Sequence, residues 1–199
     1  MKKILHIIAS LSGENSSSTK LGNAIIDKIK DVHGGCTVVT HNLTYSPYPH
    51  LEGAHLAAFF TPIDKHTDEN KKAVRSSDFA IAEIFAADII IISTPMWNFT
   101  VPSVLKAWVD HIARAGITFK YTETGIEGLV TGKKVYLAIS SGSIYSDGVY
   151  KPYDFVEPYL RAILGFIGMT DISMFRVEGT NIPGVQDTAL QKGIDSIVL

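Results

Sequence analysis

Short apolar runs, rich in β-branched residues, alternate along the chain with stretches whose apolar residues recur at helical spacing. The short runs predict strands at residues 4–9, 37–41, 88–93, 134–140 and 171–177, of which the first is expected to be buried. The third of them contains four consecutive isoleucines, Ile89–Ile92, and such a run is stable only where both faces of a strand are covered. We therefore expect this strand at the centre of a sheet.

The stretches between these runs predict helices. Leu21, Ala24, Ile25 and Ile29 follow the spacing of an amphipathic helix. Further helices are expected at residues 71–86, 102–115, 158–167 and 185–198, whereas residues 45–68, with three prolines, are expected to be irregular.

The helix at 102–115 has recognisable ends. Pro102 suits the first helical position and Gly116 a stop, while Asp110 and Arg114 have the i, i+4 spacing of an ion pair. Residues 119–125 are expected to form an extended excursion or a hairpin.

The alternation of strand and helix predicts an α/β protein: one parallel sheet with right-handed crossovers and helices on both faces. Composition agrees with one globular domain over residues 1–199, since 46% of the residues are hydrophobic and 19% charged. In such a sheet, ligands bind at the carboxyl ends of the strands. The loops that follow the strands therefore hold the candidate chemistry.

Charge and composition exclude several classes of protein. The net charge of −2 lacks the basic excess of a nucleic-acid-binding protein, and the apolar runs are far shorter than the roughly 18 residues that span a bilayer. Cys36 is the only cysteine, which favours a reducing, cytoplasmic location, and no signal-peptide cleavage pattern follows Met1. The seven histidines show no ligand spacing, so no metal is expected.

The loop after the first strand, residues 10–19, contains six hydroxyl residues and leads into a helix. A helix start offers unpaired N–H groups and a positive dipole, which bind anions. Neither the Walker nor the Rossmann glycine pattern is present, so a mononucleotide phosphate is favoured over ATP or a dinucleotide. The alternative is a simple N-cap in a flexible serine-rich turn.

Two further loops follow central strands. Residues 94–102 combine Trp97 and Phe99 with Asn98, which offers both donor and acceptor groups to a heterocycle. The alternative is a proline-bracketed turn that packs its aromatics into the core or an interface. Residues 140–143 are small and polar, and Gly142 permits a close approach of the backbone to a planar ring.

Three segments carry a resemblance to a known family: residues 95–99, residues 112–123 with the sequence IARAGITFKYTE, and residues 128–134. In these segments the chain resembles the FMN-dependent NADH-azoreductases, which are flavodoxin-like NADH:quinone oxidoreductases. The resemblance extends through residues 158–171 and covers nearly the whole chain. It implies a three-layer flavodoxin-like fold with strand order 2-1-3-4-5.

The resemblance also implies the cofactor residues. The FMN phosphate would be held by Ser10, Ser16, Ser17 and Ser18. The flavin ring would be enclosed by Met96, Trp97, Asn98 and Phe99 of the second loop and by Ser140, Ser141, Gly142 and Ser143 of the third. Relatives often carry Tyr at position 97, Arg at 141 and Gly at 143, so flavin tuning or substrate contacts differ here.

In this family the flavin carries the chemistry, and no catalytic side chain is assigned. NADH or NADPH would visit the flavin transiently, and a quinone or an azo compound would then take two electrons in a ping-pong cycle. Relatives form homodimers with flavin sites at the interface, so Phe119 and Tyr121 are candidates to cover the partner's site, and Phe99 to contact substrate.

Two other functions compete with a reductase. One is a flavodoxin-type electron carrier without NADH reactivity, although such carriers are strongly acidic and this chain is not. The other is a regulatory domain that binds a phosphorylated ligand through the serine-rich loop, in which case residues 97–99 would have no purpose.

Overall fold

The five predicted strands form one parallel sheet. The computed structural model of the protein describes residues 1–199, apart from the side chain of Glu14. The strands run in the order β2-β1-β3-β6-β7, all parallel to their neighbours, with bounds Lys2–Ile8 (β1), Cys36–Asn42 (β2), Ile89–Pro95 (β3), Lys134–Ser140 (β6) and Asp171–Val177 (β7). The order 2-1-3-4-5 expected for the sheet is confirmed, since the hairpin strands β4 and β5 lie outside it.

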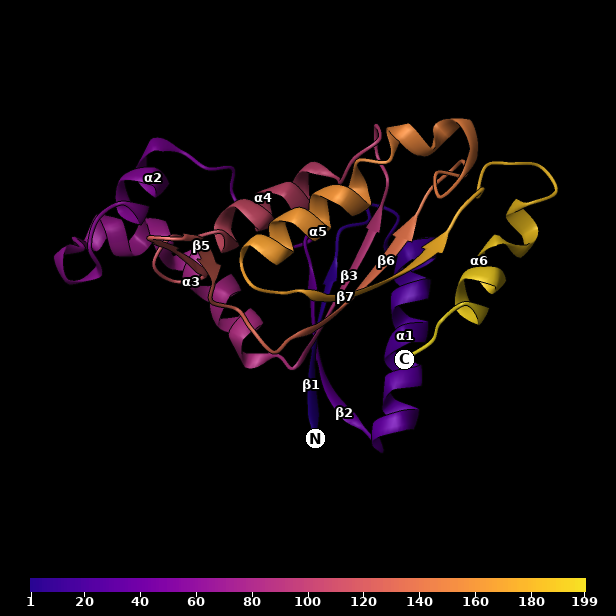
Figure 1. The fold of residues 1–199 in the computed structure, drawn as a ribbon, viewed down its shortest axis with the longest axis horizontal. Coiled ribbons are helices and arrows are strands. Elements are labelled where there is room, and N and C mark those ends of the chain that lie inside the picture. The colour runs from indigo at the N-terminus through magenta and orange to yellow at the C-terminus, as the bar shows by residue number, and fades with distance from the viewer.

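Helices cover both faces of the sheet. Figure 1 shows α1 and α6 on one face and α3, α4 and α5 on the other. Their bounds are Ser17–His33 (α1), Asp68–Ala86 (α3), Ser103–Ile112 (α4), Val156–Phe166 (α5) and Gln186–Asp195 (α6), with single-turn helices at Gly13–Asn15 (η1) and Ile63–Lys65 (η2) and a longer one at Gly148–Tyr153 (η3). Among the described residues, no helix has both the length and the apolar sequence needed to cross a bilayer.

The isoleucines of β3 are divided between the two cores. Ile89 and Ile91 pack with α1 and α6, whereas Ile90 and Ile92 pack with α3, α4 and α5. All four are buried, and each contributes roughly 1.5–3 kcal/mol by leaving water. The prediction of a central strand with both faces covered is confirmed.

Helix α1 lies unusually close to the sheet at Gly22. A Cβ atom at this position would lie 2.1 Å from Ser93 Oγ and 2.7 Å from His6 Nε2. His6 and Ser93 themselves share a hydrogen bond of 2.8 Å between Nε2 and Oγ. Burial lowers the pKa of His6 to about 4, so the ring under the helix is neutral at pH 7.

The less regular region expected at residues 45–68 contains one short helix that the sequence did not predict, α2 (Gly53–Phe59). Only His55 and Ala58 of this short helix are buried, so it has no apolar stripe to predict it. The next helix, α3, begins at Asp68 rather than residue 71, because Thr67 caps it: its hydroxyl accepts a hydrogen bond of 3.2 Å from Asn70 N.

The helix predicted at residues 102–115 is shorter than expected, since α4 ends at Ile112. The predicted pair between Asp110 and Arg114 is therefore wrong. Arg114, beyond the helix, forms its ion pair with Asp78 on α3, and Asp110 pairs with Lys106 one turn earlier. Gly116 lies in the turn that follows rather than at the helix end, with φ of 79°.

The predicted hairpin is present as β4 (Phe119–Thr122) and β5 (Gly125–Gly128), which pair antiparallel. Phe119 is buried, with its ring centroid 4.5 Å from that of Phe166 on α5, whereas Tyr121 is 72% exposed. The two aromatics therefore have different surroundings. The hairpin itself lies beside the helical layer, away from the carboxyl ends of β3 and β6 (Figure 1).

Candidate functional site

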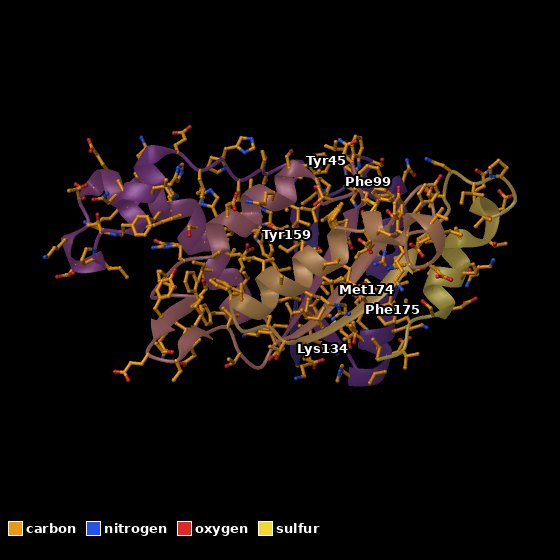
Figure 2. All side chains as sticks on the ribbon, turned by 45° about the horizontal axis from the view of Figure 1, so that its top comes forward. Tyr45, Phe99, Lys134, Tyr159, Met174 and Phe175 are labelled. Carbon is orange, nitrogen blue, oxygen red and sulfur yellow. The ribbon has the colours of Figure 1, made fainter. Side chains whose placement is uncertain are left out.

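The carboxyl ends of the three central strands bring three loops together. These are the first loop (residues 9–16), the second loop (residues 96–102) and the third loop (residues 141–147), which follow β1, β3 and β6. Backbone hydrogen bonds align their starts: Ala9 N donates to Ser93 O at 2.9 Å and Met96 N to Ser140 O at 2.7 Å. In Figure 2, Phe99 of the second loop lies at the upper end of the molecule and Lys134, which begins β6, at the lower end.

The first loop is a candidate anion site at the start of α1. Ser16 is the N-cap residue, but no side chain caps the helix, so its first N–H groups are available to a ligand. Ser10, Ser16 and Ser18 are buried, and the hydroxyls of Ser16 and Ser18 lie 2.9 Å apart. Thr19 Oγ1 is buried with no hydrogen-bond partner. A buried hydroxyl is rarely unpaired, so a bound oxyanion would complete this site.

The second loop contains a strained turn. Trp97 and Thr100 exchange backbone hydrogen bonds of 2.9 and 3.0 Å, which close a turn over the two residues between them. Asn98 and Phe99 both have positive φ, of 48° and 70°. Asn tolerates this conformation, but it is costly for a large aromatic residue. Strain of this kind is typical of binding and catalytic loops.

Aromatic residues from the segment after β6 surround Phe99. Its ring centroid lies 5.4 Å from that of Tyr153 and 6.3 Å from that of Tyr145. Its carbonyl oxygen accepts a hydrogen bond of 3.0 Å from Phe155 N. These contacts hold the ring in place while leaving 45% of the residue exposed.

The third loop is supported by the segment that follows β7. Thr180 N and Asn181 N donate to Ser141 O and Gly142 O at 3.2 and 3.0 Å. A Cβ at residue 142 would lie 2.8 Å from Asn181 Nδ2, so a larger residue here would have to displace the Asn181 side chain. The hydroxyl of Ser141 donates to Ser143 O at 2.8 Å and is thereby engaged within the loop.

A cavity of about 330 Å³ lies between the second and third loops. It is lined by Met96, Asn98, Phe99, Ser141, Gly142, Ser143, Tyr145 and Asn181. None of these eight residues carries a formal charge at pH 7, so the cavity suits an uncharged planar group with hydrogen-bonding edges.

Six of the predicted site residues therefore line one cavity. Ser16, Ser17 and Ser18 lie at the start of α1, and Ser10 lies at the beginning of the first loop, just after β1. Trp97 belongs to the second loop and Ser140 to the end of β6, but neither lines this cavity. Phe119 and Tyr121 lie on the hairpin. Sequence reasoning missed Tyr145 and Asn181, and it counted Thr19 among the hydroxyls of the first loop without naming it as a cofactor residue. The segment after β7 is a fourth strand-end loop, and the same rule would have pointed to Asn181.

Residues 2–198 match the family model of the flavodoxin-like fold. The FMN-dependent NADH:quinone oxidoreductase of Herminiimonas arsenicoxydans is 46% identical over 179 residues, which cover 90% of this chain and 88% of the relative. The chain belongs to the flavodoxin-like FMN-dependent NADH:quinone oxidoreductases. Another member, FMN-dependent NADH:quinone oxidoreductase 2 of Hahella chejuensis, is 40% identical over 195 residues. These residues cover 98% of this chain and 96% of the relative.

Solved structures agree with this family. An azoreductase from Bacillus anthracis str. Sterne superposes with a TM-score of 0.89 at 31% identity, covering 98% of this chain and 96% of its own. An FMN-dependent NADH-azoreductase from Bacillus anthracis str. Ames Ancestor, solved in complex with FMN, has a TM-score of 0.85 at 28% identity, with 97% and 94% covered. The resemblance found in the sequence is confirmed.

Proposed function

We propose that the protein is an FMN-dependent NADH:quinone oxidoreductase that also reductively cleaves aromatic azo compounds. The observation that carries the proposal is the pairing of an anion site with an uncharged ring cavity at neighbouring strand ends, in a chain 46% identical to a named FMN-dependent NADH:quinone oxidoreductase. FMN has a phosphate at one end and a planar ring at the other, and the two parts of the site match these two ends.

The residues present fit the phosphate. Ser10, Ser16, Ser17 and Ser18 would surround it, together with Thr19, whose buried Oγ1 is unpaired. No acidic residue lies in the first turn of α1 to repel the anion. We propose that the hydroxyls and free N–H groups of this turn replace a positively charged side chain.

The residues of the second and third loops fit the ring. Met96, Trp97, Asn98 and Phe99 would enclose it from one loop, and Ser140–Ser143 from the other, with Tyr145 and Asn181 added. Among the described hydrogen bonds, the N–H groups of Met96, Trp97 and Ser141 are used within the protein. We infer that the N–H groups of Asn98, Gly142 and Ser143 are those that stabilise negative charge on the ring.

When bound, FMN supplies a ring that accepts a hydride from NADH or NADPH and passes two electrons to a quinone or an azo compound. The protein's part is to bind and orient. Phe99, half exposed at the cavity, offers an apolar face to a flat substrate. The lining residues place no carboxylate or ammonium against the ring.

We further propose that the chain is one domain that works in the cytoplasm as a homodimer with flavin sites at the interface. The exposed Tyr121 on the hairpin supports this arrangement, because it lies outside its own chain's cavity and is free to cover the partner's. Phe119 is buried beneath it, 5.6 Å between ring centroids, and would support Tyr121 rather than contact substrate.

An anaerobic titration of FMN-reconstituted protein with NADH tests the function. Loss of the visible flavin band at one equivalent of NADH, reversed by a quinone, is the expected result. A bound flavin that NADH does not bleach would indicate an electron carrier instead. Absence of FMN binding would refute the assignment of all three loops.

A further inference from the structure

Arg176 is a buried charge outside the proposed cofactor site. It lies on the edge strand β7, and its side chain is 10% exposed. The guanidinium lines a second cavity, of about 760 Å³, between the start of α5 and α6. A buried arginine is stable only when its charge is paired.

Three carboxylates from different segments converge on this guanidinium. Its Nη2 donates to the carboxylate of Asp154 and, at 2.9 Å, to Glu157 Oε2, while Nη1 lies 3.6 Å from Glu178 Oε1. Asp154 and Glu178 are 8% and 13% exposed. Burial lowers the pKa of Arg176, but the hydrogen bonds to Glu157 and Asp154 outweigh it and raise the pKa overall.

Asp154 connects Arg176 to the second loop. Its other oxygen, Oδ1, accepts hydrogen bonds from Val156 N at 2.9 Å and Glu157 N at 3.3 Å, which fixes the start of α5. The residue between, Phe155, donates from its N–H to Phe99 O at 3.0 Å. Asp154 thus lies next to the residue whose N–H holds the strained turn at Phe99.

Glu178 connects Arg176 to the third loop. Its Oε1 accepts hydrogen bonds from Tyr145 N at 2.7 Å and Ser146 N at 2.9 Å, and its Oε2 from the hydroxyl of Ser146. Tyr145 lines the ring cavity and contacts Phe99. A single carboxylate therefore anchors the far end of this loop.

We propose that Arg176 is a positioning residue that fixes the second and third loops relative to each other by holding Asp154 and Glu178 together. The flavin part of this inference rests on the proposed function. Without the guanidinium, three carboxylates would face one another with no cation between them, and their repulsion would separate them. Lys151 and Lys192 are the other cations that line this cavity.

Arg161 provides a matched control. It also links α5 to β7, because its Nε donates to Glu157 Oε1 at 2.7 Å and its Nη1 to Ile172 O at 3.1 Å. It shares Glu157 with Arg176, yet the described contacts do not join it to Asp154, to Glu178 or to either loop. Arg161→Met thus removes an arginine that links the same two elements, α5 and β7, and leaves the contacts of the two loops intact.

The test compares Arg176→Met with Arg161→Met by FMN titration and by amide hydrogen exchange of the flavin-free protein. In Arg176→Met we expect FMN affinity to fall about tenfold or more, and the amides of Tyr145 and Ser146 to exchange at least about tenfold faster. In Arg161→Met both changes stay below about twofold.

Equal FMN affinity and equal amide exchange in the two variants would overturn the inference. If Arg176→Met does not fold, Arg176→Lys decides: its ammonium keeps the charge but not the fork, so an affinity unchanged from wild type would refute the role. Wild-type protein that fails to bind FMN would refute the proposed function alone. The exchange of the Tyr145 and Ser146 amides would still decide whether Arg176 holds the third loop.

Discussion

The left-handed backbone at Phe99 predicts an unusual order of stability. Phe99 has φ of 70°, a conformation that costs a residue with a side chain roughly 1–2 kcal/mol and costs glycine nothing. We compare Phe99→Gly with Phe99→Ala. Both variants lose the ring and its contacts with Tyr145 and Tyr153, so the difference between them reports the backbone alone.

Two terms set the size of this difference. Glycine removes the conformational cost in the folded protein. Its greater freedom in the unfolded chain offsets about 0.5–1 kcal/mol of that gain in stability. We therefore expect Phe99→Gly to be about 1 kcal/mol more stable than Phe99→Ala. For a chain of this length, this is roughly 2–4 °C in Tm.

Urea unfolding of the FMN-free variants measures the difference without a contribution from ligand binding. Trp97, on the flank of the same turn and similarly exposed, does not have a positive φ. The order should reverse there, with Trp97→Ala more stable than Trp97→Gly by about 0.5–1 kcal/mol. A Phe99→Gly variant that is no more stable than Phe99→Ala would refute the argument from strain.

Three further predictions follow from the structure. Gly22→Ala should destabilise the protein by about 1–3 kcal/mol in urea unfolding, because the added Cβ would clash with Ser93 Oγ. The control, Gly165→Ala, places its Cβ in open space on α5 and should be neutral or stabilising. Equal effects of the two substitutions would argue against close packing of α1. His6 has a pKa of about 4 in the folded protein and 6.5 in the unfolded chain, so the unfolded chain binds the proton more tightly. As the pH falls from 6.5 to 4, the free energy of unfolding of wild type should therefore decrease by up to about 3 kcal/mol. The His6→Gln variant should not show this decrease. Tyr121→Ala should lower quinone turnover and leave FMN affinity unchanged, and unchanged turnover would exclude Tyr121 from the substrate site.

The sheet was predictable because its signal is local. A buried parallel strand needs a near-continuous apolar run, and the inner strands β1, β3 and β6 have one. The edge strands β2 and β7 are less apolar, but β-branched or hydrophobic residues still mark them, and segments long enough for helices separate all five. The loops at the carboxyl ends of β1, β3 and β6 followed from the same logic, and six residues taken from two of them line the ring cavity.

What sequence could not supply depends on contacts between distant residues. Helix α2 is held by tertiary packing of two residues and leaves no periodic pattern. Arg114 was assigned a partner four residues away, but its charge is satisfied 36 residues away, on Asp78. The link from Arg176 through Asp154 and Glu178 likewise joins segments that only folding brings together.

The absence of a side chain at Gly22 also fixes the distance between the two ends of the proposed ligand site. Because α1 is pressed onto β1 and β3 at this point, the anion site at its start and the ring cavity beyond β3 are held at one fixed spacing. A molecule that carries both a phosphate and a ring satisfies the two ends only if the chain between them has the matching length. In the proposed cofactor site, selection among phosphorylated ring compounds would depend on the distance between the phosphate contacts and the ring contacts, as well as on the contacts themselves.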